Sequence, residues 1–392
     1  MRGLNSCMMR KADIERYCRA LIVADHVMVD TADEAEIILV WTCAFRQDFR
    51  DASADVVRNY HDQYPDKRVI ATGCLPDIDP EYLAHRFKGT VIPWRKAEQG
   101  LSTLFDVGGL GNRLLAEAPL PISLKEYQET HPEVKTTHCD QFIKLFISEG
   151  CPFNCTYCAE IRAFPKFQSF PMDRIVADCL RVVRHTGNIH VVLHGDCLGE
   201  YGRDFPDGKP TFSQLLFELR LAIPNIRIGL RNMHPASLLA SWRMVSNYLM
   251  DGTIFLLETP IQSANDRVLG MMARGYTKDQ IDLIFKDLSI TNFSELETHV
   301  IAGFPSETPT EFQETVEFLL RWRPKYVLVS GFMAAPGSVA AQMAAQVPPK
   351  EIRRRVLSAC EQLEAAGIIV NHDSCDLCKK RFEHPLVDGL FV

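Results

Sequence analysis

The sequence of 392 residues lacks any long apolar run. No stretch approaches the roughly 20 apolar residues that a membrane-spanning helix requires. Near the start of the chain, acidic Asp13 and Glu15 come before any signal-like apolar stretch. We therefore expect a cytoplasmic protein that makes no contact with a membrane.

The sequence also lacks an excess of basic residues. Its 43 Lys and Arg residues are outnumbered by 50 Asp and Glu residues, which gives a formal net charge of −7. Proteins that bind long RNA through its phosphates use a basic surface, because phosphate contacts dominate the affinity. The charge therefore disfavours a large RNA partner.

Cysteine, in contrast, is abundant, with 13 residues in the chain. Disulfides are rare in a reducing compartment. This number of cysteines, in a chain without a secretory signal, is therefore better explained by metal ligands than by a disulfide framework. Hydrophobic residues make up 46% of the chain, which is enough for a globular core. The length suits two domains, the larger of about 200 residues.

Residues 1–106 alternate helical and strand-like stretches. An amphipathic segment at 11–24 leads to a strand-like run at 36–43, a polar helical run from Asp48 and a second strand-like run at 67–74. Apolar strands separated by helices predict a small N-terminal α/β domain with a parallel sheet.

Both strand-like runs of this domain end at a cysteine, Cys43 and Cys74. Open α/β sheets build their sites at the carboxyl ends of strands. A metal site that Cys7, near the start of the chain, completes is one interpretation of this pattern, although the sequence separations are wide and nonspecific. The alternative is that all three are buried core thiols.

Residues 107–140 are rich in Gly, Pro and polar residues, which predicts a linker. Six strand and helix pairs follow in residues 141–347, and these predict a partial parallel (β/α)6 barrel, open at one side, with its reacting groups at the carboxyl ends of the strands. The expected strands cover residues 141–148, 190–196, 226–232, 252–261, 295–304 and 326–332. Residues 348–392 are expected to form one charged helix and a tail.

Three cysteines follow the first expected barrel strand at the spacing Cys-x-x-x-Cys-x-x-Cys. The segment EGCPFNCTYCAE contains Cys151, Cys155 and Cys158. A loop of this length presents three thiolates to three irons of one 4Fe-4S cluster and leaves the fourth iron open. Zinc is the alternative, but a closed zinc site requires a fourth ligand.

The cysteine loop, with Tyr157 before its last cysteine, resembles that of the radical S-adenosylmethionine (SAM) superfamily. The resemblance implies a radical SAM barrel in which SAM binds the open iron and Tyr157 lies near the adenine. It also implies reductive cleavage of SAM to a deoxyadenosyl radical. The hard chemistry then belongs to the cofactor, while the protein provides orientation.

A closer resemblance, over most of residues 1–347, is to the radical methylthiotransferases. Five barrel segments occur in the order of that family's signatures: VVLHGDCLGEYGRD, RIGLRNMHP, PIQSANDRVLGMMARGYT, HVIAGFPSET and APGSVAAQM. The resemblance implies a second 4Fe-4S cluster held by Cys7, Cys43 and Cys74. It also implies a cofactor pocket that includes Gly195, Asp196, Arg231, Gln262 and Gly303. The alternative for Gly303 is that it only permits a tight turn between strand and helix. Arg274 lies in the third of these segments, and for it the alternative to a role in the site is a charge on the protein surface.

The other cysteines have weaker assignments. Cys375 and Cys378 form a lone Cys-x-x-Cys pair, for which zinc, a third cluster, a part in sulfur transfer and plain surface thiols are all open. We expect packing roles for the remaining ones, Cys18, Cys139, Cys179, Cys197 and Cys360.

The tRNA-modifying members of the resembled family end in a small all-β RNA-binding module, whereas the residues after Val347 predict a helix and a tail. We therefore expect a sulfur-inserting radical enzyme whose substrate is a small molecule, nucleoside-like among the options, and not tRNA. A tRNA or protein methylthiotransferase and a non-catalytic iron–sulfur electron-transfer protein are the two alternatives. Cleavage of SAM needs a strongly reducing cluster, which implies a low-potential flavodoxin or ferredoxin as electron donor.

Overall fold

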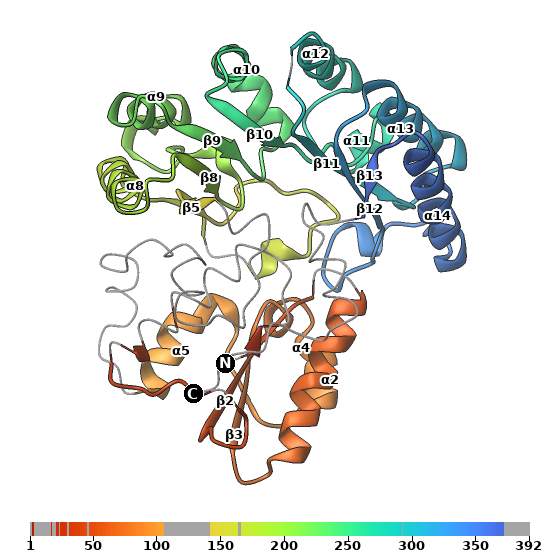
Figure 1. The fold of residues 1–392 in the computed structure, drawn as a ribbon. Coiled ribbons are helices and arrows are strands. Elements are labelled where there is room, and N and C mark those ends of the chain that lie inside the picture. The colour runs from red at the N-terminus through yellow and green to blue at the C-terminus, as the bar shows by residue number, and fades with distance from the viewer. Residues whose placement is uncertain are drawn as a thin grey trace.

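The computed structural model contains an N-terminal domain and a barrel domain, which lie one below the other in Figure 1. We use these names for the described residues up to 105 and from 142 onward. The structure describes residues 2–3, 17, 21–22, 24–29, 31–44, 47–105, 142–163, 166–291 and 293–371. The helix expected at 11–24 lies mostly outside them, as does the whole of the expected linker.

The N-terminal domain is a parallel sheet between two layers of helices. Its strands pair in the order β1 (Arg2–Gly3), β2 (Ile37–Thr42), β3 (Arg68–Gly73) and β4 (Thr90–Val91). Its helices are α2 (Gln47–Gln63), α3 (Leu75–Ile78), α4 (Pro80–Arg86) and α5 (Ala97–Leu104), with the short 3-10 helix η1 (Trp94–Lys96) before α5. Val40 packs into one apolar layer and Trp41 into the other, because successive strand residues face opposite sides of the sheet.

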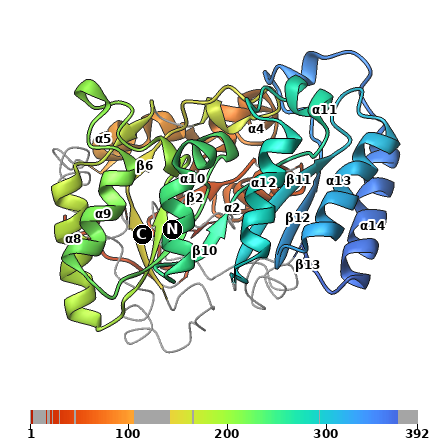
Figure 2. The same ribbon diagram turned by 90° about the horizontal axis from the view of Figure 1, so that it is seen from above.

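The barrel domain is a curved parallel sheet covered by helices on its outer side. The strands are β5 (Ile143–Phe146), β8 (His190–His194), β9 (Arg227–Leu230), β10 (Ile254–Glu258), β11 (Leu296–Ala302), β12 (Tyr326–Gly331) and β13 (Ile369–Val370). The helices are α8 (Met172–Thr186), α9 (Phe212–Ala222), α10 (Pro235–Met250), α11 (Asp266–Met271), α12 (Lys278–Ser289), α13 (Pro309–Trp322) and α14 (Pro349–Ala365). Figure 2 shows the long helices following one another around the outside of the sheet in chain order.

The predicted fold class is confirmed: a parallel α/β domain precedes a partial barrel whose six expected strands are β5, β8, β9, β10, β11 and β12. The sheet carries a seventh strand, β13, which the sequence pattern did not predict. A segment of two residues is too short to show the alternating pattern of a strand. Residues 369–370 form a strand only because they pair with the edge of β12. Within the described residues no helix is long and apolar enough to cross a membrane.

Candidate functional site

The loop with the three predicted cluster cysteines begins just beyond the first barrel strand. The short strand β6 (Ser148–Glu149) leads into Gly150, whose φ of 76° suits glycine. Cys151, Cys155 and Cys158 follow, and each is half-buried. The loop lies at the carboxyl ends of the strands, between the barrel sheet and the N-terminal domain (Figure 1). This is the end at which parallel barrels build their sites.

Backbone contacts hold this loop at both ends. The Gly150 N–H donates to a carboxylate oxygen of Asp196 at 2.8 Å. Farther along, the Thr156 N–H donates to the Met272 carbonyl at 3.1 Å, and the Thr156 carbonyl accepts from the Ala340 N–H at 2.8 Å. The positions of the thiols are therefore set by β8 on one side and by the segment around α11 on the other.

Arg274 is buried beneath the loop, only 4% exposed. Its Nη1 lies 3.2 Å from the Cys155 sulfur and 3.1 Å from the Tyr157 hydroxyl, and its Nη2 donates to the Pro260 carbonyl at 2.6 Å. Burial opposes its charge, but Tyr157, Tyr276 and Cys155 hold its pKa above the ordinary value. The alternative of a surface charge at Arg274 is wrong, because the side chain is buried and every one of these contacts is inside the protein.

A fourth cysteine adjoins the loop. The Cys197 thiol hydrogen-bonds Cys151, which lowers the pKa of Cys151 and raises that of Cys197. Burial raises the pKa of Cys158 above its usual range. A buried thiol of this kind releases its proton when a metal binds. Two other cysteines with predicted packing roles lie in the barrel domain. Cys179 is fully buried in the barrel core, and Cys360 is partly buried and packs against that core.

Within the part of the chain that the structure describes, no group of three or more His, Cys, Asp or Glu side chains is positioned to hold one metal ion. The spacing of the three loop thiols is the pattern of a four-iron cluster, in which each thiolate binds a different iron.

The turn after β8 meets the start of the cysteine loop. A Cβ atom on Gly195 would stand 2.5 Å from the Ser148 hydroxyl oxygen, so any larger residue there would displace that hydroxyl. That hydroxyl is buried and has no hydrogen-bond partner among the described residues. A close glycine backbone and an unsatisfied hydroxyl suit a pocket that receives a polar ligand. The structure thus brings Gly195 and Asp196 to the cysteine loop.

Arg231, which directly follows β9, points at carboxylates on the next two strands, β10 and β11. It lies 3.6 Å from Glu258 and 3.2 Å from Glu297, and His299 Nε2 lies 3.8 Å from Glu258. Leu296 and Val300 pack into the outer core, so Glu297 and His299 face the inside of the barrel. We did not identify these partners from the sequence, although the alternation of apolar and charged residues in β11 could have revealed them.

Gln262 and Gly303 contribute through their backbones. Gln262 has a φ of 64°, its N–H donates to the His299 carbonyl at 2.8 Å, and its carbonyl accepts from the Ile301 N–H at 2.9 Å. Gly303 has a φ of 80°, and its N–H donates to Glu307 at 2.6 Å. Both shape turns at the barrel mouth, and for Gly303 this agrees with the tight-turn alternative.

Cys43 and Cys74 lie side by side in the N-terminal domain. β2 and β3 are paired in parallel with Thr42 opposite Gly73, and the two buried cysteines are the next residues of each strand. The Cys74 N–H donates to the Thr42 carbonyl at 3.0 Å. Cys7, Cys18, Cys139, Cys375 and Cys378 lie outside the described residues.

These two cysteines lie at the interface with the barrel domain. Cys74 and Leu75 share an apolar cluster with Ala159 and Ala163, which directly follow the cysteine loop. Nearby, the Arg95 guanidinium donates to the Ile161 carbonyl at 3.4 Å. Both sets of cysteines therefore border one interface.

Comparisons with known families match the two parts of the chain separately. Residues 145–319 match the radical SAM superfamily, and residues 5–92 match the uncharacterized protein family UPF0004. Among solved structures, the radical SAM methyltransferase TsrM from Kitasatospora setae has a TM-score of 0.57 at 12% identity and covers 86% of this chain and 76% of that one. At this identity the likeness concerns the fold.

Relatives resemble the chain over most of its length. A probable threonylcarbamoyladenosine tRNA methylthiotransferase from Pyrococcus horikoshii is 27% identical over 352 residues, which is 89% of this chain and 80% of the relative. A tRNA-2-methylthio-N(6)-dimethylallyladenosine synthase from Dehalococcoides mccartyi is 27% identical over 361 residues, 89% and 78% of the two chains. A ribosomal protein uS12 methylthiotransferase from Parasynechococcus marenigrum is 28% identical over 366 residues, 91% and 76%.

The barrel, its cysteine loop and the superfamily match define a radical SAM enzyme, which uses a 4Fe-4S cluster and SAM. Within that superfamily, the chain belongs to the methylthiotransferase family. The expectation of a small-molecule substrate without tRNA is wrong, because these relatives are named for tRNA or a ribosomal protein. The net charge misled us, since a charge summed over the whole chain says nothing about one local surface.

Proposed function

We propose that this enzyme attaches a methylthio group to a base of tRNA. The observation that carries the proposal is that Cys43 and Cys74 directly follow two adjacent strands, at the interface that the loop of Cys151, Cys155 and Cys158 also borders. Cleavage of SAM requires the loop and the cofactor pocket of the barrel, but no second group of thiols. A second group of thiolates beside the loop supplies a place from which sulfur reaches the activated carbon. The similarity to tRNA methylthiotransferases supports tRNA as the substrate.

In this proposal Cys151, Cys155 and Cys158 hold the cluster that binds SAM. Together the bound cluster and SAM supply radical abstraction of hydrogen from an unactivated carbon. The chain orients them: Thr156 fixes the loop through its backbone, and Arg274 places a permanent positive charge beside Cys155. That charge offsets part of the negative charge that thiolate ligands bring.

The cofactor pocket in this proposal is formed at the ends of β8 to β11. Gly195, Asp196, Gln262 and Gly303 supply backbone and carboxylate groups around its rim, and Tyr157 belongs to the cysteine loop itself. Inside the barrel, Arg231 with Glu258, Glu297 and His299 forms a polar wall. Carboxylates of this kind accept hydrogen bonds from nucleoside hydroxyls.

The N-terminal domain provides the second site. We propose that Cys7 joins Cys43 and Cys74 as ligands of an auxiliary 4Fe-4S cluster that delivers sulfur. The parallel register of β2 and β3 supports this part, because it brings Cys43 and Cys74 to one edge of the sheet. Ribosomal protein uS12 is a second candidate substrate, because the relative named for it covers 91% of this chain.

Mass spectrometry of tRNA nucleosides from cells with and without the gene tests the proposed function. We expect one methylthio-adenosine nucleoside to disappear without the gene and to return with the wild-type chain. The variant with Cys151, Cys155 and Cys158 all changed to Ala should not restore it. Intact tRNA nucleosides together with a uS12 protein that has lost the mass of a methylthio group would establish the second candidate instead.

A further inference from the structure

The turn after β11 owes its shape to a buried glutamate. The Gly303 N–H, at a φ of 80°, donates to a carboxylate oxygen of Glu307 at 2.6 Å. The Glu307 side chain is fully buried. Residues 303–307 therefore form a closed turn whose geometry depends on the position of this carboxylate.

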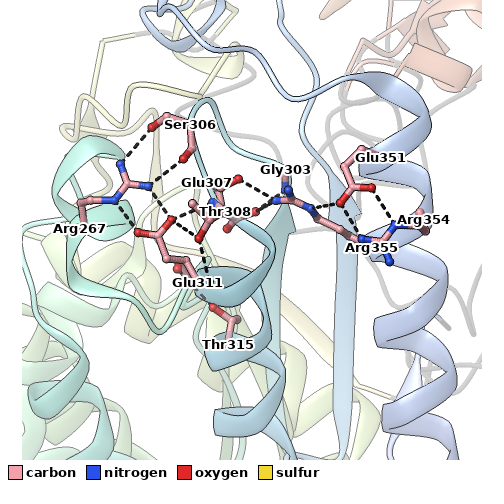
Figure 3. Close-up of polar contacts among 11 residues, drawn as sticks. Arg267, Gly303, Ser306, Glu307, Thr308, Glu311, Thr315, Glu351, Arg354 and Arg355 are labelled. Carbon is pink, nitrogen blue, oxygen red and sulfur yellow. Dashed lines mark hydrogen bonds and ion pairs between the residues drawn. The ribbon is translucent and has the colours of Figure 1, made fainter.

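An arginine on the last long helix holds that carboxylate. Arg355 of α14 is 6% exposed, and its Nη1 donates to the Glu307 backbone carbonyl at 2.9 Å and lies 3.3 Å from the Glu307 carboxylate. Its Nε donates to Glu351 at 2.9 Å, so Arg355 lies between two glutamates (Figure 3). The planar guanidinium is suited to such a forked set of contacts.

A second contact of α14 is apolar and falls on the same turn. A Cβ atom on Gly303 would stand 2.5 Å from Ile352 Cγ1, and one on Gly331 would stand 2.8 Å from Ile352 Cγ2. Ile352 thus rests against the bare backbone at the ends of β11 and β12. It also packs in the apolar cluster that contains Phe304 and Tyr157, the latter from the cysteine loop.

We propose that Arg355 and Ile352 are positioning residues, by which α14 holds the 303–307 turn in the shape that receives SAM. This inference rests on the cofactor pocket of the proposed function, but not on the identity of the methylthio acceptor. A merely structural role would attach α14 to the barrel without changing the affinity for SAM.

Binding of SAM to the anaerobically reconstituted chain tests the inference, with Arg355→Met as the main variant. Without the hydrogen bonds from Arg355 the turn is no longer held in one shape, and the free energy of reordering it on binding corresponds to a loss of affinity of about tenfold or more. We expect the KM for SAM to rise by that factor, with kcat at saturating SAM within about twofold of wild type. Hydrogen exchange at the Gly303 amide should become faster, while the iron content stays unchanged.

Arg354→Met is the matched control. Arg354 neighbours Arg355 and pairs with the same Glu351 at 2.7 Å, but its side chain is 64% exposed and has no contact with the turn. It should bind SAM as the wild type does. Ile352→Ala removes the apolar contact with the turn and keeps every charge. It should also weaken the binding of SAM. This variant tests the same turn if the Arg355→Met protein does not fold.

The inference is overturned if a folded Arg355→Met variant binds SAM with wild-type affinity. If that variant does not fold, wild-type affinity of Ile352→Ala for SAM overturns it. A wild-type chain that binds no SAM overturns the proposed function and this inference with it. SAM binding without any effect on tRNA overturns only the choice of substrate.

Discussion

Arg274 Nη1 lies 3.2 Å from the sulfur of Cys155, although the two residues are 119 positions apart in the chain. The guanidinium is buried, and it also contacts the Tyr157 hydroxyl and the Pro260 carbonyl. Reduction potentials of clusters depend on nearby charge and on hydrogen bonds to the sulfurs. Arg274 thus connects the segment after β10 to the loop that we propose as the site of the cluster.

Replacing Arg274 should therefore change the reduction potential of the loop cluster and not only the stability of the fold. We expect Arg274→Met to shift the reduction potential of the loop cluster to a more negative value, because a compensating positive charge is lost. Substitution of such outer-shell partners usually costs about 10- to 100-fold in activity or metal affinity. Redox titration followed by electron paramagnetic resonance measures the shift.

Arg321→Met is the control for that experiment. Arg321 lies on α13, is 65% exposed and pairs with Asp282 of α12 at 3.8 Å. It should leave the potential unchanged. An Arg274→Met protein with the wild-type potential would show that this arginine has only a structural role.

The iron content should report two separate clusters. Anaerobic reconstitution should give about eight irons per chain, and about four should remain when Cys151, Cys155 and Cys158 are all changed to Ala. Cys360→Ala, which alters a half-buried cysteine far from both sets in sequence, should keep all of them. Iron analysis with protein quantification decides the matter, and an unchanged count in the triple variant would contradict the ligand assignment.

The two cysteine sets should also differ in what they do. Cys43→Ala and Cys74→Ala should abolish methylthio transfer, because the auxiliary site is lost, yet still yield 5′-deoxyadenosine from SAM. Liquid chromatography of the reaction products measures both outcomes at once. If deoxyadenosine formation stops while the loop cluster is spectroscopically intact, the roles are wrongly divided.

Glu307 should make stability depend on pH. Burial raises the pKa of Glu307 from 4.5 to about 7, in spite of Arg355 and the Gly303 amide, which favour the charged form. Because the folded-state pKa is the higher one, the stabilisation is complete below pH 4.5 and is lost as the pH rises through 7.

Urea unfolding between pH 4.5 and 7 measures this effect. The free energy of unfolding of the wild type should fall relative to that of Glu307→Gln by at most about 3 kcal/mol. Glutamine has a similar shape to glutamate and does not titrate, so the Glu307→Gln variant is the reference for the wild type at each pH. A difference that stays flat or grows with pH would show that Glu307 is fully ionised in the folded protein.

The strands were predictable because their apolar residues are long and regular. The runs at 36–43 and 67–74 became β2 and β3, and each of the six barrel strands was found where expected. β13 was not predictable, because two residues carry no period and only pairing with β12 defines them. The helix α14 was predictable as a helix, but its contact with Gly303 was not.

The substrate was the largest error of the sequence interpretation. Net charge and the apparent absence of a β module suggested a small molecule, whereas the relatives point to tRNA or a ribosomal protein. Both arguments used properties of the whole chain or of its end. Recognition is a local property of the surface around a site, and composition does not describe it.

What the sequence determined by itself is the spacing of the cysteines and the order of the elements that carry them. The spacing of Cys151, Cys155 and Cys158 is a local property, and so is the position of Cys43 and Cys74 at the ends of strands. Only the tertiary structure decided which charged groups meet these sites. Arg274 and Arg355 are distant in sequence from Cys155 and Glu307, and such contacts arise from the packing of helices on the sheet, which no local pattern encodes.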